Sequence, residues 1–239
     1  MPYPGYQYPF IYTLGTDAYQ NYDSRYIDNI VAFVYDSQQA YAAAFSELGP
    51  CAAAYAWDRW DNVKYAPADT FTMYHWGDGK AWGGYQPRAF QGACRAYQEL
   101  KLRGTFDALS TTTKTKLVSF ITNWVNWLVA YIGKPNNPTR SLPTDWYPTA
   151  ISHPELTGTT PSQTMVTSPC FPWYEKDYGA ASDGSVIYID PASGLPVPND
   201  FTAHMTGLWL AGACQAWLGG LRIAGLESLI EACFTELHS

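Results

Sequence analysis

Apolar side chains recur at helical spacing in five segments of the chain, separated by stretches rich in proline, glycine, serine and threonine. In the clearest segment, Leu117, Trp124 and Leu128 fall on one face and Gly133 provides a stop signal. The spacing and the capping signals predict helices over residues 24–48, 87–102, 111–132, 200–218 and 222–237. Residues 185–197 (SVIYIDPASGLPV) instead predict a strand, a turn and a second strand. We therefore expect a mainly α protein with a small β-hairpin.

Two regions lack this periodicity. Residues 1–23 are rich in tyrosine and proline, which predicts an extended arm that lies on a neighbouring surface. Residues 133–199 hold many prolines but also several tryptophans and tyrosines, which indicates a long loop insertion pinned to the rest of the protein. We predict that residues 24–239 form a single mainly helical domain containing that insertion.

A short sequence echo links two of the predicted helices. Residues 92–97 read Gly-Ala-Cys-Arg-Ala-Tyr, and residues 212–217 read Gly-Ala-Cys-Gln-Ala-Trp. Small residues on one stripe allow helices to approach closely, so the echo suggests a repeated helix–loop–helix unit. Chance similarity between two alanine-rich helices is the alternative.

Residues 55–85 form an aromatic segment in which nine aromatic residues alternate with four aspartates and several glycines. The rings follow neither a helical nor a strand period, which core residues would do. Sugars stack their C–H faces on such rings and donate their hydroxyl groups to carboxylates. Alternatively, the rings pack the segment onto neighbouring helices, with indole N–H and phenol O–H groups as tethers.

This segment supplies the candidate site residues. The candidate ligand-binding residues are Trp57, Trp60, Tyr74, His75, Trp76, Trp82 and Tyr85. Glycoside hydrolysis requires two carboxylates that flank the bond, and the candidate catalytic residues are Asp58, Asp61, Asp69 and Asp78. The same aspartates could instead cap helices, bond turn amides or pair with Arg59. His75 and His204 could each act as a general base or hold a loop by hydrogen bonds.

Composition narrows the class of partner. The net charge of −7 argues against nucleic acid, which requires concentrated Lys and Arg, and no basic helix or long apolar run points to a membrane. The N-terminus lacks the pattern of a secretion signal. Five cysteines without metal or redox spacing predict free, buried thiols in a reducing compartment. We expect no cofactor and no metal.

Several segments resemble modules found in tail-associated structural proteins of bacteriophages. The resemblance covers residues 9–103, with a weaker echo at 199–217, and its phrases are PFIYTLGTDAYQNYDSRYIDNIVAFVYDSQQAYAAAF, GPCAAAYAWDRWD, DTFTMYHW and WGGYQPRAFQGACRAY. Such modules look like pieces of the α/α-toroid of many glycosidases and lyases. The resemblance implies a partial α/α-toroid-like helical array, because a full ring needs about a dozen helices and the pattern predicts five. No catalytic residue is carried over from it.

The resulting expectation is a phage virion protein of the tail or adsorption apparatus that contacts host-surface glycan through its aromatic residues. It would be made in the host cytoplasm and assembled into the virion. Its partners would be other virion subunits or further copies of the chain, and bacterial surface polysaccharide. Two alternatives remain open: a glycoside hydrolase or polysaccharide lyase acting on bacterial surface polysaccharide, and a purely structural virion subunit.

Overall fold

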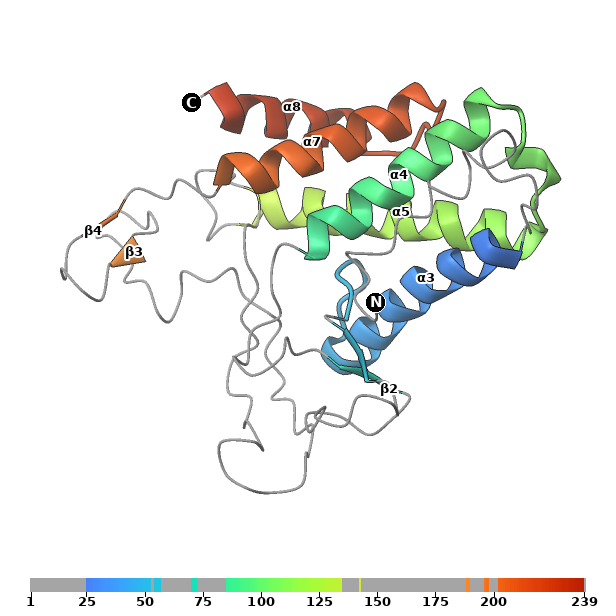
Figure 1. Cartoon of the computed structure of the whole chain (residues 1–239). Coiled ribbons are helices and arrows are strands. Elements are labelled where there is room, and N and C mark those ends of the chain that lie inside the picture. Colours follow the sequence, from blue (N-terminus) through green and yellow to red (C-terminus); the bar gives the residue numbers. More distant parts are fainter. Residues whose placement is uncertain are drawn as a thin grey trace, which may run out of the picture.

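The computed structural model describes the helical part of the chain and a few short extended pieces (Figure 1). The described residues are 25–52, 54–56, 70–72, 85–134, 142, 188–189, 196–197 and 202–238. The α-helices are α3 (Arg25–Phe45), α4 (Tyr85–Leu102), α5 (Thr111–Ile132), α7 (Thr202–Leu218) and α8 (Leu226–His238), with a 3₁₀ turn η2 (Phe106–Ala108). The prediction of a mainly α protein is confirmed for this part of the chain.

Capping explains where the predicted helix bounds held and where they failed. Helix α5 matches its prediction, since Ser110 accepts a hydrogen bond from the Thr113 N–H at its start and Gly133 caps its end. Helix α3 was predicted to continue to residue 48, but it ends at Phe45, because Ser46 takes a left-handed conformation with φ of 56°. Helix α8 was predicted from residue 222. It begins only after Gly225, which has a φ of 83°.

The predicted starts of the other two helices were each off by two residues, since α4 begins at Tyr85 and α7 at Thr202. Such differences at helix ends are small compared with the whole element.

The extended pieces form two antiparallel pairs. Strands β3 (Tyr188–Ile189) and β4 (Pro196–Val197) pair within the predicted hairpin, with Tyr188 opposite Val197. Strands β1 (Ala54–Ala56) and β2 (Thr70–Thr72) also pair, with Tyr55 opposite Phe71. The second pair was not predicted, because it joins residues far apart within a segment that has no strand period.

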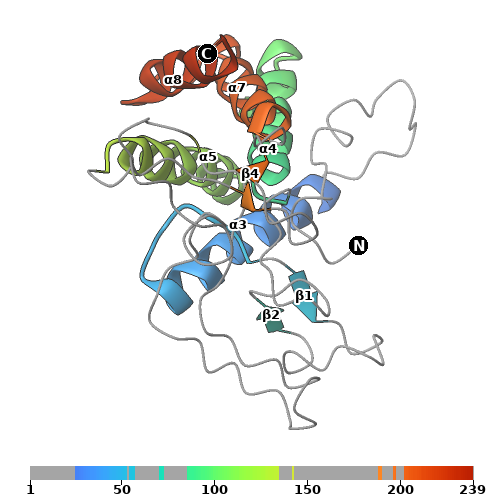
Figure 2. The same ribbon diagram turned by 90° about the vertical axis from the view of Figure 1, so that its left-hand side faces the viewer.

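The helices form two hairpins that lie side by side, with α3 against one of them (Figures 1 and 2). Helices α4 and α5 make one hairpin, and α7 and α8 make the other. Helices α4 and α7 run parallel. Gly212 lies against Phe90 and Gln91, and Gly219, further along the chain, lies against Tyr97 and Gln98, which are further along α4 by the same number of residues. No helix in the described ranges combines the length and apolar character needed to cross a membrane.

The sequence echo therefore lies at the contact between the two hairpins. Gly212 of α7 and Gly219, which directly follows α7, leave no room for a β-carbon, so the backbone approaches α4 directly at both points. Ala93, Cys94, Ala213 and Ala216 are buried along the same contact. A hydrogen bond from the Gln91 amide to Gln215 Oε1, at 3.0 Å, also joins the two helices. The repeated motif is thus a helix-packing motif.

An aromatic cluster fills the centre of the core, where α4, α5 and α7 meet. The rings of Trp124 and Trp209 are 5.0 Å apart, and Phe90 lies 5.5 Å from Trp209 and 6.5 Å from Trp124. All three side chains are fully buried. Tilted and edge-on rings at these distances are favourable beyond the area that they bury.

Candidate functional site

Most of the candidate site residues fall outside the described part of the chain. These residues are Trp57, Asp58, Trp60, Asp61, Asp69, Tyr74, His75, Trp76, Asp78 and Trp82. Tyr85 is the first residue of α4, and His204 lies in the first turn of α7. What the structure does describe is the framework from which the aromatic segment extends.

The β1–β2 pair connects two parts of the aromatic segment to α3. Tyr55 and Phe71 lie opposite each other with ring centres 5.0 Å apart, and Phe33 of α3 is 5.9 Å from Tyr55 and 5.3 Å from Phe71. All three side chains are half-buried. These two rings of the segment therefore serve to pack it onto a helix, as the packing alternative proposed.

The chain that enters the aromatic segment is held by buried amide side chains. Gln86 of α4 accepts a hydrogen bond from the Cys51 N–H at 2.8 Å and donates one to the Cys51 carbonyl at 2.9 Å. The Ala52 N–H donates to the Ser37 carbonyl at 3.0 Å. Because both backbone groups of Cys51 are satisfied by one side chain, this stretch is fixed in the core without a neighbouring strand.

A second amide, Gln38 of α3, ties the same stretch to α5. Its Nε2 donates to the Gly49 carbonyl and to the Phe120 carbonyl, and its Oε1 accepts from Asn123 at 2.8 Å. Two consecutive amides in an apolar helical pattern, Gln38 and Gln39, were the available sequence signal for such a role. That signal was missed, since it does not show which backbone groups the amides satisfy.

The described cysteines carry free thiols, as predicted for Cys51, Cys94, Cys214 and Cys233, while Cys170 lies outside the described residues. Burial raises the pKa of the Cys51 thiol to about 12, against the opposing effect of hydrogen bonds with Ser37 and Trp124. Burial also raises the pKa of the other three thiols. Because the thiolate is the nucleophile, none of the four suits covalent catalysis at neutral pH.

One carboxyl group, that of Glu236 in α8, is half-buried. It accepts hydrogen bonds from the Leu142 N–H at 2.8 Å and from the Thr206 hydroxyl at 3.2 Å, and so links α8 to α7. Burial raises the pKa of Glu236 above its ordinary value of 4.5, and this effect outweighs the two hydrogen bonds, which favour the charged form. Glu236 is spaced from the buried residues Leu229 and Cys233 so that all three lie on one face of α8, and this spacing was the sequence signal that Glu236 faces the interior.

The raised pKa of Glu236 predicts a pH dependence of stability. The folded protein retains a proton that the unfolded chain releases, so the free energy of unfolding should fall as the pH rises above 4.5 and the carboxyl group ionises. Glu236→Gln should flatten this decrease in urea unfolding measured across a pH series. The control is Glu231→Gln, an exposed position on the same helix, which should keep the wild-type pH profile. An unchanged profile in Glu236→Gln would contradict the prediction.

Among the residues that the structure describes, no three His, Cys, Asp or Glu side chains are grouped so that they could hold a metal ion. Comparison with protein family models gave no match, and comparison with curated proteins and with solved structures gave none either. Any assignment of function therefore depends on the residues of the chain itself.

Proposed function

We propose that this chain is a subunit of a bacteriophage virion, in the tail or adsorption apparatus, which contacts host-surface glycan through its aromatic segment. The observation that carries the proposal is the composition of residues 55–85, where nonperiodic rings alternate with aspartates. The framework supports it, because Gln86 and the Phe33–Tyr55–Phe71 cluster hold the segment against α3 and α4. A segment fixed at these points can present its remaining rings with less loss of conformational entropy on binding.

We further propose that the helices belong to a partial α/α-toroid-like array. Repeating a helical hairpin by a small rotation places successive first helices parallel and side by side. The parallel contact of α4 with α7, each followed by an antiparallel helix, supports this arrangement. The open end of such an array would be completed by other virion subunits or by further copies of the chain.

The test replaces Trp60, Trp76 and Trp82 by alanine, one at a time. Binding to immobilised bacterial lipopolysaccharides and capsular polysaccharides is measured by biolayer interferometry, and folding by circular dichroism. Each substitution should weaken binding about tenfold, the effect of losing one anchoring ring. Tyr26→Ala, which removes an exposed ring on α3, should leave binding unchanged. If all three tryptophan variants unfold, the rings belong to the core and the proposal fails.

The two competing functions predict different results with the same polysaccharides. A glycosidase or lyase would release new chain ends from the polysaccharide, and Asp58→Asn, Asp61→Asn, Asp69→Asn or Asp78→Asn would abolish the release. A purely structural subunit would bind no polysaccharide. The packing of Tyr55 and Phe71 on Phe33 is the observation that favours this structural alternative.

A further inference from the structure

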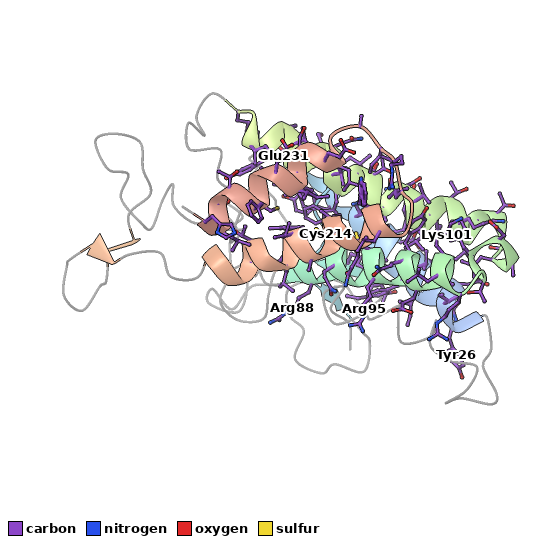
Figure 3. The ribbon with its side chains drawn as sticks, turned by 90° about the horizontal axis from the view of Figure 1, so that it is seen from above. Tyr26, Arg88, Arg95, Lys101, Cys214 and Glu231 are labelled. Atoms are coloured by element: carbon purple, nitrogen blue, oxygen red, sulfur yellow. The ribbon has the colours of Figure 1, made fainter. Side chains whose placement is uncertain are left out.

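A groove lies between α7 and α8, on the outer hairpin of the described helices. It encloses about 420 Å³ and is lined by Cys214, Trp217, Leu218, Glu227, Ile230 and Glu231. Figure 3 looks down onto these two helices and labels Cys214 and Glu231. Helical spacing continues the apolar lining from Ile230 to Phe234 and Leu237. Leu218 is 60% exposed and Phe234 is 56% exposed, so the stripe is open to water.

Trp217 has a fixed orientation at one end of the groove. The Arg222 guanidinium lies 4.2 Å from its ring centre and donates to the Trp217 carbonyl at 2.6 Å. The indole N–H donates to Glu227 Oε1 at 3.3 Å. The ring nevertheless remains 37% exposed. Tryptophan and arginine held in place before binding are typical of residues that anchor protein interfaces.

The repeat relation indicates the shape of the occupant. In α4, Tyr97 and Gln98 are the residues that contact Gly219, which directly follows the parallel helix α7. When the two Gly-Ala-Cys motifs are aligned, the equivalent residues of α7 are Trp217 and Leu218. Both lie on the groove, whose other side is formed by α8, and the Trp217 indole is bonded to Glu227 of that helix. Helix α7 therefore presents the positions through which its partner α4 contacts the C-terminal end of a helix.

Charge indicates the chemistry of the occupant. Glu227 and Glu231 lie one turn apart on α8 and give the groove an acidic edge. Arg222, a cation beside the groove, is engaged with Trp217 and with backbone carbonyls. A second copy of the same groove would place carboxylates against carboxylates, and the whole chain carries −7. A basic partner suits this edge better than a second copy does.

From these observations we propose that the groove binds an amphipathic α-helix of a different protein. Small and apolar residues of that helix lie on Trp217 and Leu218, and its Lys or Arg residues pair with Glu227 and Glu231. This inference does not rest on glycan binding by the aromatic segment, which involves other residues of the chain.

The test uses a fluorescein-labelled helical peptide of about 18 residues, long enough to follow α7, with alanine and leucine on one face and lysine along the edges. Fluorescence anisotropy with the full chain should show binding, and a peptide with glutamate in place of every lysine should bind at least about tenfold more weakly. Glu227→Gln/Glu231→Gln should weaken the lysine peptide about tenfold. Leu218→Ser should do the same, and because this side chain is largely exposed the fold should be retained.

The matched control is Asp36→Asn/Glu99→Gln, which removes the same charge from α3 and α4, where the two side chains pair with Lys116 and Arg103. Binding by this control should equal that of the wild type. Equal weakening by both double variants would show general attraction to an acidic protein and overturn the proposal. Equal affinity for the two peptides, absence of binding, or a dimer in sedimentation that Leu218→Ser dissociates would overturn it as well.

Discussion

Gly49→Ala is expected to lower the free energy of unfolding by about 3 kcal/mol, at the upper end of the usual range for overpacking. A β-carbon at residue 49 would lie 2.3 Å from Cβ and 2.6 Å from Cγ of Trp127. Because the nearest atom is itself a β-carbon, no rotation of the tryptophan side chain can relieve the clash. The backbone of residues 49–52 must move instead, and with it the hydrogen bonds that Gln38 and Gln86 make to this stretch.

Urea unfolding monitored by circular dichroism measures this loss. The control is Gly104→Ala, where no atom lies within 4 Å of the added carbon and only the left-handed backbone, with φ of 67°, opposes the change. That conformation costs about 1 kcal/mol for an alanine. If the two variants were equally stable, Gly49 would not be in close contact with Trp127.

Gly212→Ala is expected to lower the free energy of unfolding by about 2 kcal/mol, although alanine favours the helix more than glycine does. The added carbon would lie 2.7 Å from the Phe90 ring and 3.1 Å from the Gln91 α-carbon. Phe90 is held between Trp124 and Trp209, so its ring cannot turn away, and α4 and α7 must separate.

The matched control for this substitution is Gly207→Ala on the same helix, where nothing lies within 4 Å of the new carbon. Here only the higher helix propensity of alanine acts, and we expect a gain of about 0.5–1 kcal/mol. Urea unfolding of the two variants compares one chemical change at two positions of α7. A similar stability for both would contradict the close approach of α4 and α7.

The sequence determined the helices because their signals are local. Each cap and each step of the apolar period lies within a few residues of the position that it specifies, which is why α5 was predicted from Thr111 to Ile132 and the β3–β4 hairpin from a single turn. The Gly-Ala-Cys echo suggested a repeated helix–loop–helix unit, and the two helices that carry it lie against each other. For the candidate site, the sequence named an aromatic segment, and most of its residues lie outside those described.

Only the tertiary structure decided how distant residues meet. No local pattern shows that Gln86 satisfies both backbone groups of Cys51, that Tyr55 pairs with Phe71 across a loop, or that Glu236 of α8 bonds to Thr206 of α7. The same holds for Trp217 and Leu218, whose helical period resembles that of Tyr97 and Gln98. Only the packing of the hairpins places Tyr97 and Gln98 against Gly219 and leaves Trp217 and Leu218 on an open groove. Periodicity fixes the face of a helix on which a residue lies, whereas the presence of a neighbour on that face depends on contacts far apart in the chain.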